Sequence, residues 1–144
     1  MTSALSAPVI GSVFHCVVPV RWGDLDAQNH VNNTVYFRYF EEARVQLFRK
    51  VGLVLAENKV GILVHASCDF LKPVLYPATL VVGLVLTRVG RTSMEFDTII
   101  ECQDDAGVVY AKGKNVIVGA DAATGKPTPW TPSELAAFAQ YFVE

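Results

Sequence analysis

One stretch of helical periodicity, followed by strand-like segments, constrains this fold more than any other sequence feature. Over residues 34–51, large apolar side chains recur at helical spacing, as Tyr36, Phe40, Ala43 and Leu47. Asn32 or Asn33 can cap the start of this helix, and Gly52 can end it. From about residue 60 the apolar period changes from 3.6 to two, so the chain predicts one long helix set among β-strands.

The strand-like segments indicate how this helix is covered. We expect strands at residues 13–21, 60–73, 80–89, 94–102 and 108–118, and a short terminal helix at 133–142. Runs of strands around a single helix predict the α+β class. Because the apolar helix must be covered, we expect an antiparallel sheet of about five strands wrapped around one long central helix. The four strands after the helix are joined by short turns, which predicts an antiparallel meander.

The length and charge of the chain suit a single domain that associates with other copies. From 144 residues we expect a loose N-terminal arm over residues 1–11 and one domain over 12–144. Charged residues make up only 18% of the chain. A surface with so few charges indicates that another subunit covers part of it, so we expect a homo-oligomer.

Charge and cysteine content exclude several classes of function. The net charge of −2 and the pI of about 5.9 argue against a nucleic-acid partner. The three cysteines form no Cys-x-x-Cys pair, which argues against a disulfide framework and a zinc site. The N-terminus lacks a signal-peptide pattern, and no apolar run reaches the roughly 18 residues of a membrane span. We therefore expect a cytoplasmic protein without a metal site or a membrane span.

Polar residues that could take part in catalysis are concentrated in residues 21–44. Two carboxylates, an imidazole and four amides lie just before the predicted start of the helix. That helix end offers unpaired backbone N–H groups and the positive end of the dipole, which would polarise a carbonyl oxygen. An ionised carboxylate beside such a carbonyl can attack it or take a proton from water. The spacing therefore favours hydrolysis of an acyl compound.

The same segment resembles the 4-hydroxybenzoyl-CoA thioesterase family, most closely its bacterial long-chain acyl-CoA thioesterase branch. The likeness spans about residues 13–129 and rests on Asp24-x-Asp26, His30-Val31-Asn32-Asn33, Tyr36, Tyr39-Phe40-Glu41-Glu42-Ala43-Arg44, Cys68-x-Phe70-x-x-Pro73 and Gly90-Arg91-x-Ser93. The resemblance implies a hotdog fold, a dimer or tetramer, and hydrolysis of acyl-CoA thioesters without a metal or other cofactor.

Carried over residue by residue, the resemblance implies a role for individual positions within residues 21–44. Asp26, the second Asp of the pair, would be the catalytic carboxylate, acting as general base or nucleophile. The backbone N–H near Asn33 would hold the thioester carbonyl, and His30 and Asn32 would position water, carboxylate or carbonyl. Residues 27–29 are Ala-Gln-Asn where some members have Pro and Gly, which fits the fatty-acyl branch better than an aromatic acyl preference.

Substrate binding requires both a cation and an apolar groove. CoA carries phosphates, so Arg or Lys is expected near the mouth of its site. Arg91 in the Gly90–Ser93 turn is the first candidate and Arg88 the second, although both can serve only as solubilising charges. The acyl chain is expected in a groove between helix and sheet at a subunit interface, with Tyr36 among the lining residues.

Structural readings of the same residues remain open. Asp26 can stabilise a turn, and His30 can be an ordinary hydrogen-bonded loop residue. Glu41 and Glu42 on the helix indicate a solvated or salt-bridged face in preference to a catalytic glutamate. The alternative functions are a non-catalytic acyl-CoA or lipid-binding hotdog protein and a thioesterase acting on acyl-carrier protein. A hotdog dehydratase is disfavoured because the chain lacks the His and acid pattern that it needs.

Overall fold

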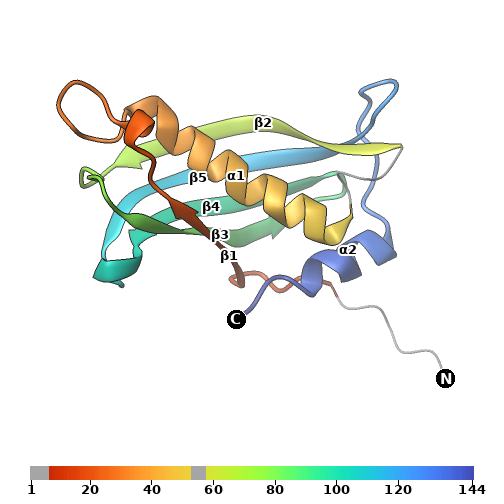
Figure 1. Ribbon diagram of the computed structural model, residues 1–144. Helices are drawn as coiled ribbons and strands as arrows, with labels where there is room; N and C mark the ends of the chain where they lie inside the picture. The colour runs from red at the N-terminus through yellow and green to blue at the C-terminus, as the bar shows by residue number, and fades with distance from the viewer. Residues whose placement is uncertain (1–6, 53–57) are drawn as a thin grey trace.

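A five-stranded antiparallel sheet curls around one long helix in the computed structural model, which describes residues 7–52 and 58–144 (Figure 1). The expected α+β hotdog architecture, with one long and one short helix, is confirmed. The elements are β1 (Val13–Pro19), the 3-10 turn η1 (Trp22–Asp24), α1 (Asn33–Val51), β2 (Lys59–Phe70), β3 (Thr79–Val89), β4 (Ser93–Cys102), the 3-10 turn η2 (Gln103–Asp105), β5 (Val109–Asp121) and α2 (Pro132–Ala139).

Helix α1 begins and ends where its terminal residues allow. The side chain of Asn32 accepts a hydrogen bond from the Thr34 N–H at the start. Gly52 follows the last turn with a φ of 84°, a left-handed conformation that strains other residues. The buried face is large and mostly aromatic, so it packs against the concave side of the sheet; its members are Tyr36, Tyr39, Phe40, Ala43, Leu47 and Phe48.

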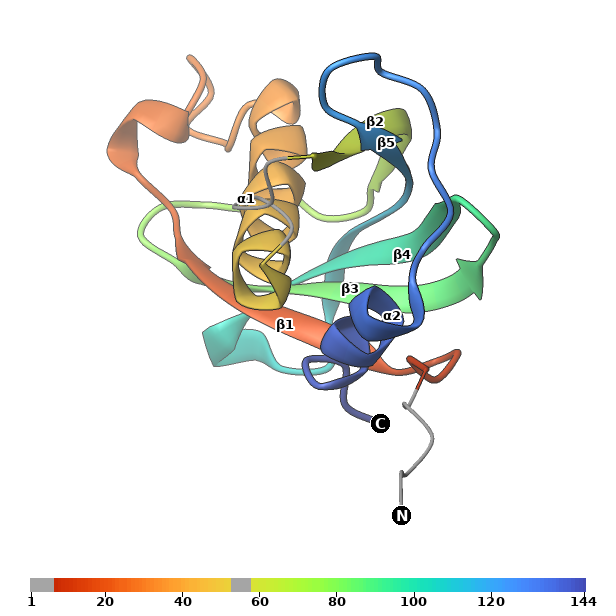
Figure 2. The same ribbon diagram turned by 90° about the vertical axis from the view of Figure 1, so that its right-hand side faces the viewer.

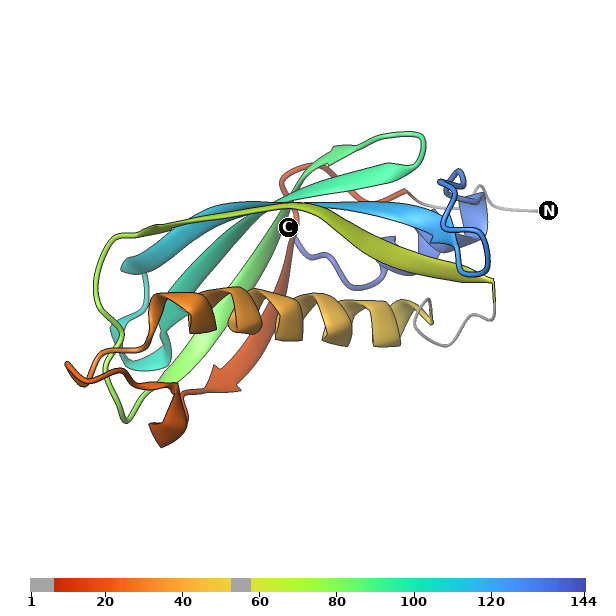
Figure 3. The same cartoon turned by 90° about the horizontal axis from the view of Figure 1, so that it is seen from above.

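The strand order is β1-β3-β4-β5-β2, and this corrects the expected meander. Only β3, β4 and β5 are consecutive neighbours, whereas β2 pairs with β5 at the far edge. The connection over residues 71–78 is longer than a hairpin loop and contains two prolines, so it crosses the end of the sheet. Helix α1 carries the chain from β1 at one edge to β2 at the other, as Figures 2 and 3 show.

The two edges of the sheet differ in what covers them. Strand β1 is partly covered by the C-terminal segment, because Val13 and Val143 exchange both backbone hydrogen bonds, at 2.7 and 2.9 Å. Strand β2 has no neighbour on its outer edge among the residues that the structure describes. Most of its side chains are exposed, including the six consecutive positions 62–67. The β2 edge is therefore the larger unsatisfied surface.

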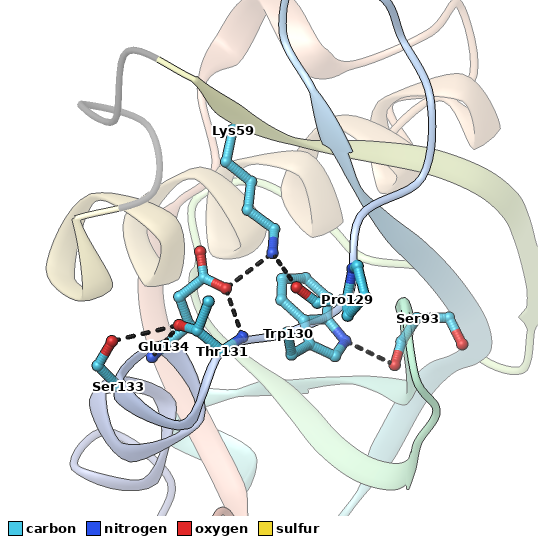
Figure 4. Close-up of polar contacts among 7 residues, drawn as sticks. All are labelled: Lys59, Ser93, Pro129, Trp130, Thr131, Ser133 and Glu134. Carbon is cyan, nitrogen blue, oxygen red and sulfur yellow. Dashed lines mark hydrogen bonds and ion pairs between the residues drawn. The ribbon is translucent and has the colours of Figure 1, made fainter.

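Helix α2 is tied to the sheet by a buried ion pair (Figure 4). The Lys59 ammonium donates to Glu134 Oε1 and to the Pro129 carbonyl, both at 2.7 Å, and lies 4.8 Å from the centroid of the Trp130 ring. Thr131 caps the helix through a reciprocal pair of hydrogen bonds with Glu134. The helix ends at Ala139, earlier than the expected 142, and Phe142 beyond it stacks on Phe96 in the core.

Three further expectations concern the N-terminal arm, a membrane span and the ends of two strands. Residues 1–6 of the expected arm lie outside the described residues, while Gly11 already donates to the Leu86 carbonyl at 2.8 Å. No helix in the described part of the chain is both long and apolar enough to cross a membrane. Strand β2 ends at Phe70, three residues before the expected end, and β5 continues three residues beyond its expected end to Asp121.

Candidate active site

The loop before α1 is held against the helix by Asp24. Its Oδ2 accepts hydrogen bonds from the Arg21 N–H at 2.9 Å and from the Tyr39 hydroxyl at 2.8 Å. Burial and the hydrogen bond to this carboxylate raise the pKa of Tyr39, so the phenol remains a donor. Asp24 therefore positions the loop through hydrogen bonds, and it forms no ion pair within the described residues.

Asp26 stands in a tight turn with half of its carboxylate unused. Its Oδ1 accepts hydrogen bonds from the backbone N–H groups of Gln28, at 2.8 Å, and His30, at 3.3 Å. Asn29 closes the turn with a φ of 61°, a conformation that Asn tolerates. Within the described residues no donor reaches Oδ2. The turn expected as the structural alternative is thus present, and it leaves one carboxylate oxygen free.

The tip of α1 also keeps a free donor. Asn32 Oδ1 accepts from the Thr34 N–H at 2.9 Å and from the Thr34 hydroxyl at 2.7 Å. The Val35 N–H donates to the Asn32 carbonyl at 2.9 Å. The Asn33 N–H has no acceptor in residues 7–52 and 58–144. Because the first N–H groups of a helix carry its positive end, this donor can bind a carbonyl oxygen.

A cavity of about 380 Å³ joins these two features. It contains four of the residues expected at the site, Asp26, His30, Asn33 and Tyr36, and its remaining lining residues are Gln28, Val31, Phe70, Leu71, Lys72 and Pro73. The structure therefore brings the free carboxylate and the helix tip to one hollow. Asn32 is absent from the lining because its side chain is occupied as the helix cap.

Tyr36 forms the inner wall of the cavity. Its side chain is 2% exposed, and its hydroxyl accepts a hydrogen bond from the Val74 N–H at 3.3 Å. Burial raises the pKa of the phenol, so it stays protonated and can still donate. The Phe70 ring packs edge-on against it, with centroids 4.9 Å apart. This wall is apolar apart from one hydroxyl, which suits the carbon chain next to an acyl carbonyl.

The two arginines expected to bind CoA lie elsewhere in the protomer. Strand β3 runs away from the Asp26 cavity, so Arg88, near its end, and Arg91, in the following turn, lie at the opposite end of the sheet (Figure 1). Arg88 pairs with Glu95 at 3.1 Å. Within one protomer these arginines are not brought to the cavity.

Residues between β2 and β3 line the cavity although their role was not inferred from sequence. Lys72 is the one lysine or arginine among the lining residues, and Phe70 and Pro73 flank it. Phe70 and Pro73 belong to the Cys68-x-Phe70-x-x-Pro73 motif, which was the available signal. Lys72 carried no signal, because its place depends on how residues 71–78 cross the sheet.

The two glutamates on α1, Glu41 and Glu42, have partners on the helix itself. Glu41 pairs with Arg38 at 3.0 Å, and Glu42 accepts from Gln46 at 3.0 Å, as the salt-bridged reading of this face predicts. No group of three or more His, Cys, Asp or Glu that could hold a metal ion occurs in the described part of the chain. Among the polar residues expected at the site, those that line the cavity are Asp26, His30, Asn33 and Tyr36.

Comparison with known proteins shows the family of this chain. Residues 20–138 match the family described as the Thioesterase-like superfamily. YsmA of Bacillus subtilis is 33% identical over 119 residues, which cover 81% of this chain and 79% of YsmA. A solved "putative thioesterase" from Pseudomonas aeruginosa is 38% identical, with a TM-score of 0.81 and coverage of 88% of this chain and 98% of that one. A 1,4-dihydroxy-2-naphthoyl-CoA thioesterase from Synechocystis shares the fold at 20% identity, with a TM-score of 0.75 and coverage of 88% and 95%. The chain belongs to the Thioesterase-like superfamily.

Proposed function

We propose that the protein hydrolyses acyl-CoA thioesters to the free acid and CoA at the Asp26 cavity. Membership of the superfamily supports thioester hydrolysis in general. The observation that carries the finer proposal is that Asp26 and Asn33 line one hollow, while Asp26 Oδ2 and the Asn33 N–H have no hydrogen-bond partner among the described residues. The sequence motif favours the long-chain acyl-CoA branch over aromatic acyl groups.

In this proposal the Asn33 N–H binds the thioester carbonyl oxygen, and Asp26 activates water or attacks the carbonyl carbon. The thioester carbonyl oxygen accepts from the Asn33 N–H, and the helix dipole stabilises the negative charge that develops on it. Acting as general base, Asp26 takes a proton from water while the hydroxide oxygen bonds to the carbonyl carbon. The carbon–sulfur bond then breaks, and the CoA thiolate leaves and takes up a proton. Acting as nucleophile, Asp26 would instead form an acyl anhydride that water hydrolyses.

The neighbouring residues keep this arrangement in place. The His30 N–H shares Asp26 Oδ1 with Gln28, so the turn directs Oδ2 away from its own backbone. The imidazole of His30 lines the cavity and is placed to hold water. Asn32 acts by capping α1, which fixes the direction of the Asn33 N–H. Tyr36 borders the acyl carbons.

A second copy of the chain would complete the site. The outer edge of β2 presents unpaired backbone groups and exposed apolar side chains, a surface that natural sheets normally cover. Pairing through β2 would place a partner beside Phe70 and the mouth of the cavity. Arg88 and Arg91 remain candidates for CoA phosphates only in an assembly that brings another copy's sheet end to Asp26, whereas Lys72 already stands at the cavity of the same protomer.

Thiol release from a panel of acyl-CoA substrates tests the proposal. Asp26→Asn should lower kcat for the best substrate by roughly 10²-fold or more, the effect of removing a general base or nucleophile. Asp97→Asn, on β4 and outside the cavity, serves as the matched control and should leave kcat unchanged. If Asp26→Asn hydrolyses the best substrate as fast as the wild type, Asp26 is not the catalytic carboxylate.

The alternative functions give different results in the same assay. Tight binding of acyl-CoA without turnover by the wild type would indicate a lipid-binding protein in place of an enzyme. Faster hydrolysis of acyl groups carried on acyl-carrier protein than on CoA would change the carrier and keep the Asp26 site. A single turnover in ¹⁸O-water separates the two roles of Asp26. A general base puts the label in the product acid, whereas an anhydride that water opens at the Asp26 carboxyl puts the label in the enzyme and leaves the product acid unlabelled.

A further inference from the structure

A trough runs along α1 on the side that faces β2. It consists of two adjoining hollows of about 230 and 400 Å³, which share Glu41, Arg44 and Leu63 in their walls. The first hollow is completed by Thr34, Phe37, Arg38 and Ala66, and the second by Val45, Phe48, Val60, Gly61 and Ile117. Most of these side chains are apolar, so the trough suits a hydrocarbon chain.

The trough continues from the Asp26 cavity. Phe37, in the first hollow, and Phe70, in the cavity wall, pack against each other with ring centroids 6.5 Å apart. Thr34 and Phe37 also follow directly after the cavity residues Asn33 and Tyr36 on the helix. An acyl chain whose carbonyl lies at the helix tip would therefore cross this aromatic pair and enter the trough.

A charged side chain interrupts this apolar path. Arg44 reaches from the helix to β5, where its guanidinium donates to Asn115 Oδ1. Burial lowers the pKa of Arg44, and the nearby Glu41 carboxylate offsets only part of this effect. No carboxylate lies within 4 Å of Arg44 in the described part of the chain, and Glu41 in the same wall is already paired with Arg38.

The two buried polar side chains on the strands below differ: Asn115 also donates from its Nδ2 to the Lys114 carbonyl at 2.9 Å, whereas Thr98 has no partner among the described residues. Asn115 and Thr98 are fully buried on adjacent strands. A guanidinium offers five N–H donors, and one neutral amide oxygen leaves most of them unused. The Arg44 guanidinium is half-buried and has one hydrogen-bond partner among the described residues, so an acceptor that enters the trough can use its remaining donors.

We infer that the trough receives an acyl chain bearing an acceptor oxygen, a carboxylate or a hydroxyl, which Arg44 binds. The inference rests on the proposed function and narrows its substrate class. Arg44 follows Asn33 by eleven positions on α1, a rise of roughly 16 Å at about 1.5 Å per residue. The acceptor therefore lies near the far end of an extended chain. A saturated chain of the same length would leave the guanidinium desolvated and unpaired, and so would bind less well.

Matched acyl-CoA substrates of equal chain length, ending in methyl, hydroxyl or carboxylate, test the inference. Wild type should hydrolyse at least one oxygen-bearing chain with a kcat/KM roughly tenfold or more above the methyl chain, the range of a charge-assisted hydrogen bond. Arg44→Met should reverse this order by losing the oxygen-bearing substrate and keeping the methyl one. Comparing the hydroxyl and carboxylate chains identifies which acceptor is used.

Controls separate recognition from structure. Arg38→Met removes the other arginine in the trough wall, which is paired with Glu41, and should preserve the wild-type order. Binding of the same three CoA esters to Asp26→Asn, measured by calorimetry, gives the preference even if hydrolysis is absent. Equal losses on all three substrates in Arg44→Met, or a wild-type preference for the methyl chain, would overturn the inference while leaving a working thioesterase. Absence of turnover by wild type would instead count against the proposed function.

Discussion

The polar groups near the two ends of helix α1 differ in whether the protein itself satisfies their hydrogen bonds. At its end near α2, Lys59 and Glu134 are mostly buried, with side chains 11% and 20% exposed, and they satisfy each other at 2.7 Å (Figure 4). At its start, Asp26 and Asn33 line a cavity, and Asp26 Oδ2 and the Asn33 N–H have no hydrogen-bond partner in the described part of the chain. A polar group that is satisfied internally stabilises the fold, whereas one left free is available to a substrate.

The same contrast explains why each end has its own local structure. Lys59 and Glu134 are 75 positions apart and meet only because β2 and α2 pack at one end of the sheet. The Asp26 turn is made from residues within four positions of each other. The site end can therefore keep its shape locally while its functional groups remain unused, and the other end supplies long-range attachment.

Breaking the ion pair near α2 should give the largest effect on stability. Lys59→Met leaves the Glu134 carboxylate and the Pro129 carbonyl without their shared donor, so we expect a loss of about 2 kcal/mol in the free energy of unfolding, below the range for fully buried pairs because both side chains keep some exposure. Urea unfolding measures it, with Lys112→Met on the surface of β5 as the control. kcat at the opposite end should stay near wild type; a stable variant with lost activity would contradict the separation of the two ends.

Removing the helix cap should affect both stability and activity at the start of α1. Asn32→Ala leaves the Thr34 N–H without its acceptor, so we expect a loss of about 1 kcal/mol. Because the cap also fixes the direction of the Asn33 N–H, kcat should fall as well. Asn32→Asp retains a capping oxygen and should keep the stability of the wild type. If Asn32→Ala lowers the melting temperature without changing kcat, the helix tip does not position the carbonyl.

Protonation of Glu134 at low pH should give the smallest of these losses in the free energy of unfolding. Burial alone would raise the pKa of Glu134, but hydrogen bonds from Lys59 and the Thr131 N–H outweigh it and hold the pKa below its ordinary value of 4.5. A lowered pKa in the folded state adds stability that is complete above the unfolded value and is lost as pH falls through the folded value. Wild type should therefore be more stable than Glu134→Gln near neutral pH, with the difference shrinking below about pH 4.5. Thermal unfolding of both proteins across pH 3–7 measures this, and a constant difference would show that the carboxylate charge is not responsible.

Local chemistry in the sequence accounts for the elements and for the core of the site. The apolar spacing of residues 34–51, the cap at Asn32 and the stop at Gly52 predict α1 to within a residue. The alternation along β4 predicts its buried face, including Phe96 and Ile100. Asp26, His30, Asn33 and Tyr36 meet in one cavity because they flank a single helix start. In each case the interacting groups are close in the chain, so their geometry follows from backbone rules.

Tertiary structure decided what local patterns do not contain. Strand order, with β2 beside β5, depends on how residues 71–78 cross the sheet, and the same crossing brings Lys72 to the cavity. The distance of Arg88 and Arg91 from Asp26 follows from the direction of β3. The contact between Arg44 and Asn115 joins residues 71 positions apart. Periodicity and caps report which face of an element is buried, but which distant element covers that face is set by the packing of the whole sheet around its helix.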